Sequence, residues 1–80
     1  MDYKDLTFIS SNTGFLRNSY YCKKNKRYYC LQWDNGYDKA PVLYSSTRSG
    51  EPDCPIKKEY YKYFLFPEGH EPYESMLTNS

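Results

Sequence analysis

The stretch that most constrains the fold is residues 19–33, SYYCKKNKRYYCLQW. Two Tyr-Tyr-Cys triplets flank a block of four cations and one Asn, and the second triplet continues into Leu31 and Trp33. Tyr, Cys and Trp are favoured on a pleated strand, whereas a run of cations broken by Asn is typical of a turn. The stretch therefore predicts a β-hairpin with residues 24–27 at its tip.

A two-residue loop at residues 25–26 would place Cys22 opposite Tyr29 and Tyr21 opposite Cys30. Asn25 tolerates the positive φ that such a loop requires. A slip by one residue would mix the two faces, so we expect a defined register. Because strand side chains alternate, one face carries Tyr20, Cys22, Tyr29, Leu31 and Trp33, and the other carries Tyr21, Lys23, Tyr28, Cys30 and Gln32. The predicted core residues are Trp33, Leu31, Tyr29 and Phe64.

Length and composition favour a small β domain over a helical bundle. A chain of 80 residues buries only about 60% of its unfolded surface, so its core is thin. It has eleven Tyr and a single Ala, and Tyr favours strands whereas Ala is the best helix former. We predict a mostly β fold, a single-domain antiparallel sheet of about four to five strands built from β-hairpins, with one short helix near residues 56–66 as an option. The domain would span residues 1–66, followed by a C-terminal loop or tail at 67–80.

Turn signals place the remaining strands. Residues 6–10 predict a strand, residues 11–14 (SNTG) a turn, and residues 15–17 a short return strand. Residues 42–45 (VLYS) predict a further strand. Residues 46–55 contain one Gly and two Pro, so we expect an irregular loop there.

Residues 56–66, IKKEYYKYFLF, allow two interpretations. A helix could begin with Asp53 as its cap and Pro55 in its first turn. A strand over residues 59–66 would suit the run of aromatic side chains and would stop at Pro67. We favour the strand.

Catalytic and metal chemistry has little support in the sequence. Cys22, Cys30, Cys54 and His70 are the residue types of a zinc site, but no two of the cysteines have the spacing of roughly two to four residues that such sites use. His70 is the single His, and no nucleophile or phosphate-binding motif can be paired with it. We therefore predict a protein that is not an enzyme and has no metal or cofactor.

The lack of long apolar runs and the spacing of the cysteines restrict the cellular location. No apolar run approaches the roughly 18–20 residues of a membrane span, and residues 1–5 do not resemble a signal peptide. Three widely spaced cysteines favour free thiols over a disulfide framework. We therefore expect a cytoplasmic protein without a membrane partner.

Charge is distributed unevenly, with five cations and no anion from residue 17 to residue 27. Cations interleaved with Tyr are used by proteins that bind single-stranded nucleic acid, but the net charge of only +1 argues against that class. Tyr and Arg on a rigid β scaffold are also typical of protein-recognition surfaces. The predicted binding residues are Tyr21, Lys24, Lys26, Arg27, Tyr28, Tyr37 and Tyr44.

We therefore predict a small inhibitor or adaptor of the phage, viral or mobile-element type that binds a host protein through the Tyr-rich, basic hairpin. A nucleic-acid-binding β module that uses the same hairpin is the first alternative. A protein that binds a small ligand such as a nucleotide is the second alternative. A homodimer is left open.

Overall fold

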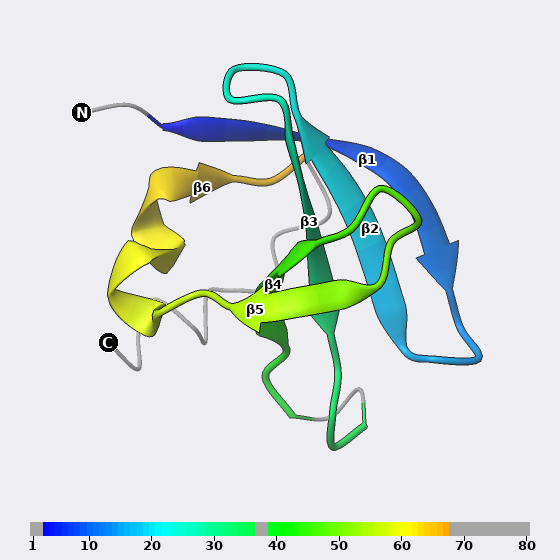
Figure 1. Cartoon of the computed structure of the whole chain (residues 1–80). Coiled ribbons are helices and arrows are strands. Elements are labelled where there is room, and N and C mark those ends of the chain that lie inside the picture. Colours follow the sequence, from blue (N-terminus) through cyan, green and yellow to red (C-terminus); the bar gives the residue numbers. More distant parts are fainter. Residues whose placement is uncertain (1–2, 37–38, 68–80) are drawn as a thin grey trace.

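A computed structural model describes residues 3–36 and 39–67 (Figure 1). In this part of the chain, six strands form one sheet in the order β5-β4-β3-β2-β1-β6. All neighbours are antiparallel except β1 and β6, which are parallel. The mostly β fold is confirmed, with slightly more strands than predicted. The elements are β1 (Lys4–Asn12), β2 (Arg17–Cys22), β3 (Arg27–Gln32), β4 (Val42–Ser46), β5 (Pro52–Pro55), the 3-10 helix η1 (Lys58–Tyr63) and β6 (Phe64–Leu65).

The sheet curls into a half-barrel, with β6 returning beside the start of β1 (Figure 1). Irregularities in pairing lie between Phe8 and Ser10 of β1 and between Ser45 and Ser46 of β4. Such bulges increase the local twist and bend a strand. The irregularity in β4 bends the turn between β4 and β5 across the sheet. Gly50 in this turn therefore lies next to Arg17 and Ser19 of β2.

The central hairpin forms as predicted, but its register differs by two residues. Tyr20 lies opposite Tyr29 and Cys22 opposite Arg27, so the loop contains residues 23–26 rather than two residues. The positive φ falls on Lys26 (59°), and not on Asn25. Asn25 instead accepts a hydrogen bond from the Arg27 backbone N–H through Oδ1 (3.1 Å). This side-chain turn keeps three of the four hairpin cations out of the strands.

A shift of two residues preserves which side chains share a face, because strand side chains alternate with a period of two. The predicted core face is therefore confirmed. Tyr29 and Phe64 are buried, as expected, and Trp33 is partly buried against the cluster. The buried core consists of Leu6, Tyr20, Cys22, Tyr29, Leu31, Leu43, Tyr61, Phe64 and Phe66.

The segment at residues 56–66 combines the two interpretations. A strand over residues 59–66 is wrong for the first five of these residues, which lie in η1. The helix places Tyr61 in the core, where its hydroxyl accepts a hydrogen bond from the Leu43 backbone N–H (3.1 Å). After η1 the burial alternates as in a strand, with Phe64 buried, Leu65 exposed and Phe66 buried.

Two further predictions along the chain need correction. Residues 52–55 form β5 rather than part of an irregular loop, and Asp53 lies in this strand rather than capping a helix. Proline is tolerated there because β5 is an edge strand. On the side of an edge strand that faces solvent, a missing N–H removes no hydrogen bond to a neighbouring strand. The predicted return strand at 15–17 is not separate, because Arg17 begins β2, which pairs with both β1 and β3. Of the predicted tail at 67–80, only Pro67 lies within the described residues.

Candidate functional site

Tyr21 and Tyr28 form a ring pair on the face of the sheet that points away from the core. The two residues lie directly opposite each other on β2 and β3. Their ring centroids are 4.8 Å apart and their planes are inclined by 46°. Both side chains are half-buried. Each therefore has one side covered by its neighbour and another side available for contact.

An open hollow of about 320 Å³ adjoins Tyr28 and extends across β3, β4 and β5. Ser46 lies directly opposite Tyr28 on β4, and Asp53 contributes a carboxylate from the edge strand. The hollow thus presents two cations and one anion beside an aromatic ring. Its lining residues are Lys26, Arg27, Tyr28, Ser45, Ser46 and Asp53. We call these six residues, together with Tyr21, the hairpin surface.

Four of the predicted binding residues belong to the hairpin surface, namely Tyr21, Lys26, Arg27 and Tyr28. Lys24 is exposed in the adjoining loop. Tyr37 lies outside the described residues. Sequence reasoning missed Ser45, Ser46 and Asp53. Residues 46–55 were expected to form a loop, no periodic pattern marks β5 as a strand, and the pairing that brings Ser45 and Ser46 beside β3 was not predicted.

Tyr44 points to the same face, but its hydroxyl is engaged within the protein. It donates a hydrogen bond to Asp34 Oδ2 (3.0 Å). Burial, followed by this bond and the Asp34 charge, raises the pKa of Tyr44 above its usual value. The other Asp34 oxygen accepts a hydrogen bond from Gln32 (3.1 Å), which in turn accepts one from Arg17 (3.1 Å). Tyr44 is therefore part of a structural network.

This network also accounts for Arg17 and Cys30. Arg17 donates a second hydrogen bond, to the Gly50 carbonyl (3.4 Å), and its guanidinium lies 5.1 Å from the Phe15 ring centroid. Cys30 is fully buried. Burial raises the pKa of the Cys30 thiol to about 11, an effect that Arg17 opposes and Asp34 reinforces. A buried and protonated thiol is a poor nucleophile.

The cysteines do not converge. Cys22 lies in the core, whereas Cys30 lies on the other face of the sheet and Cys54 is exposed on β5. Among residues 3–36 and 39–67, no three His, Cys, Asp or Glu side chains are grouped so that they could hold a metal ion. His70 lies outside these residues.

No known protein family, curated protein or solved structure matches this chain in comparisons of sequence and fold. Within the described part of the chain, no helix has both the length and the apolar character required to cross a membrane. The functional argument therefore rests on the geometry of the hairpin surface.

Proposed function

We propose that the protein acts by binding a protein partner through the hairpin surface. The observation that carries this proposal is the packed pair of Tyr21 and Tyr28 beside a hollow that contains charges of both signs. Tyr provides a large contact area for little loss of side-chain entropy, and it is enriched at the centres of protein interfaces. The pair lies on paired strands rather than on a loop, so little ordering is required on binding.

The mixed charge favours a protein over a nucleic acid. A phosphate backbone is matched by cations alone, whereas Asp53 lines the same hollow as Lys26 and Arg27. The Tyr21 and Tyr28 rings also pack against each other, so neither presents two free faces to a stacked base. A protein partner could instead place a carboxylate near the two cations and a donor near Asp53. Within this proposal, the partner is a host protein and the chain is an inhibitor or adaptor.

A site-specific photo-crosslinker tests the proposal. Benzoylphenylalanine at Ser46, inside the hollow, should link the protein to one partner on irradiation in a lysate of cells that carry the gene. The same group at Ser11 is the control, because Ser11 is exposed near the far end of the hairpin. The double substitution Tyr21→Ala and Tyr28→Ala should abolish the Ser46 product while the far-UV spectrum is unchanged. Equal products from both positions, or a product that survives the double substitution in a folded chain, would refute the proposal.

A fluorescence-anisotropy titration distinguishes the nucleic-acid alternative. Labelled single- and double-stranded DNA and RNA should give flat traces at both low and physiological salt. Binding that weakens with salt, with a log–log slope of about −0.7 for each phosphate contacted on a single strand, would overturn the proposal. It would assign Lys24, Lys26 and Arg27 to phosphates.

A further inference from the structure

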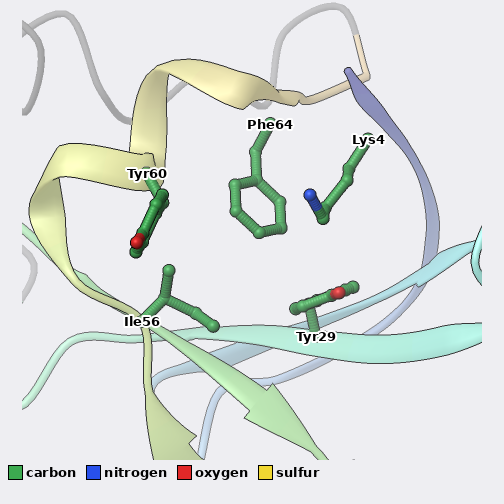
Figure 2. A pocket seen from close by; sticks show the side chains of 5 residues that line it. All are labelled: Lys4, Tyr29, Ile56, Tyr60 and Phe64. Carbon is green, nitrogen blue, oxygen red and sulfur yellow. The ribbon is translucent and has the colours of Figure 1, made fainter. Parts of the chain in front are cut away.

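A second cavity lies on the core side of the sheet, beside η1 (Figure 2). Its volume is about 260 Å³. Residues from β1, β3, η1 and β6 contribute to it, together with the segment that joins β5 to η1. Because Tyr28 and Tyr29 are consecutive in β3, this cavity lies on the opposite face of the sheet from the ring pair of Tyr21 and Tyr28. The cavity is lined by Lys4, Tyr29, Ile56, Tyr60 and Phe64.

Two walls of the cavity are fixed by packing. The Tyr29 and Phe64 rings are buried and meet edge to face, with centroids 5.0 Å apart and planes inclined by 75°. The Tyr29 hydroxyl accepts a hydrogen bond from Asn25 Nδ2 (2.9 Å), which sets the direction of the ring. Tyr60 forms the outer wall and is 48% exposed. The cavity therefore combines a preformed apolar floor with an accessible side.

Lys4 supplies the one charge in the lining. Its ammonium lies 5.5 Å from the Phe64 ring centroid, and Figure 2 shows it pointing toward that ring. The structure gives this ammonium no carboxylate partner among residues 3–36 and 39–67. The cavity thus offers apolar walls and a cation that is already oriented by an aromatic face.

We propose that this cavity binds an organic monocarboxylate that carries one apolar ring or a short branched alkyl group. The apolar part would contact Tyr60, Ile56 and Phe64, and the carboxylate would pair with Lys4. The volume of about 260 Å³ is just below the roughly 300–1,000 Å³ of ordinary ligand pockets, which limits the ligand to about one ring. The Lys4 ammonium would repel a cationic ligand, so we expect such a ligand to bind weakly.

The two Ile residues of the chain make the test direct. Ile56 lines the cavity, whereas Ile9 is exposed on β1 and serves as an internal control. In a methyl-labelled sample, phenylacetate should shift the Ile56 methyl resonance to saturation and leave Ile9 unchanged. The neutral phenylacetamide should bind roughly fivefold more weakly, which corresponds to the loss of one partly exposed ion pair. The 2-phenylethylammonium ion should bind most weakly.

A matched pair of substitutions assigns the charge preference. Lys4→Met should remove the preference for phenylacetate over phenylacetamide. Lys62→Met should retain it, because Lys62 makes the same kind of contact, 5.5 Å from the Tyr63 ring centroid, outside the cavity lining. Equal binding of all three probes, no shift at Ile56, or an unchanged preference in Lys4→Met would overturn the proposal. The probe ranking on the unmodified chain needs no variant, and it does not depend on the ring pair of Tyr21 and Tyr28 on the opposite face.

Discussion

The Tyr61 hydroxyl accepts a hydrogen bond that a neighbouring strand would otherwise accept from Leu43 of β4. Removing this hydroxyl should lower the stability of the fold. β5 pairs with β4 only from Tyr44 to Ser46, so the Leu43 backbone has no strand partner on that side. Its carbonyl accepts a hydrogen bond from the Ile56 N–H (2.8 Å) and its N–H donates to the Tyr61 hydroxyl (3.1 Å). Both the Leu43 and Tyr61 side chains are buried, with exposed fractions of 0% and 3%.

Substitution of Tyr61→Phe keeps the ring and removes one oxygen. The Leu43 N–H then has no acceptor in a region closed to water, and an unsatisfied buried donor costs about 1–3 kcal/mol. We expect a loss of about 2 kcal/mol in the free energy of unfolding, since the site is fully buried. For a domain of this size, such a loss lowers Tm by roughly 8–16 °C.

Urea and thermal denaturation, followed by circular dichroism, measure this effect. Tyr60→Phe is the matched control, because Tyr60 is the preceding residue of η1 and is 48% exposed. Hydrogen exchange gives a second, local readout, since the Leu43 amide should exchange faster in Tyr61→Phe than in the unmodified protein. If Tyr61→Phe and Tyr60→Phe differ by less than about 0.5 kcal/mol, or if exchange at Leu43 is unchanged, the hydrogen bond does not have this role.

Four further outcomes follow from local geometry. Gly50→Ala should destabilise the fold by about 1–2 kcal/mol in urea titrations, because Gly50 has a φ of +91° and an added Cβ would lie 2.9 Å from Ser19 Oγ; an unchanged midpoint would refute this. Asn25→Ala should lower the free energy of unfolding by about 1 kcal/mol, because it removes two hydrogen bonds that the Asn25 side chain makes; an unchanged midpoint in urea titrations would refute this. Iodoacetamide should modify native protein once, at the exposed Cys54, and modify all three cysteines after unfolding, as mass spectrometry can determine; two or more native modifications would contradict the burial. Burial raises the pKa of the Cys30 thiol from 9.0 to about 11, so the unfolded chain loses this proton first. The free energy of unfolding should therefore fall as pH rises from about 9 to about 11. It should fall less steeply with pH in a Cys30→Ala variant, and an equal dependence on pH in both proteins would exclude the thiol as the cause.

The faces of the central hairpin could be predicted because they depend only on alternation. Tyr20 and Tyr29 are buried and Tyr21 and Tyr28 are on the other face, whichever of the two registers forms. The register itself depends on the loop. Asn25 favours two different turns, one through positive φ and one through a side-chain hydrogen bond, and composition does not decide between them.

The edge strand could not be predicted, because its residues carry signals for a loop. Proline interrupts the hydrogen bonds of a strand in the middle of a sheet but is tolerated in an edge strand such as β5. The sequence does not indicate which strand will lie at the edge. The position of Asp53 in the hollow follows from this pairing. The four residues of the hairpin surface that lie in β2, β3 and their loop could therefore be predicted, and the three that β4 and β5 supply could not.

Tyr44 shows a different limit. Alternation predicts correctly that it points away from the core, but its hydroxyl is bound by Asp34. The turn at residues 34–36 brings this carboxylate back over β4. An outward position in a strand is therefore not the same as an available side chain.

The two prolines of β5 also determine how this side of the sheet can be used. Neither has an amide N–H, and the Cys54 N–H donates to Ser45 Oγ (3.2 Å). Within β5, the two prolines cannot donate to an added strand and the Cys54 N–H is already used, so an added strand finds few donors to join. A partner that approaches across this edge must be held by side chains rather than by backbone. Recognition of this kind changes with single substitutions and leaves the fold intact, so the same scaffold could acquire a new target without refolding.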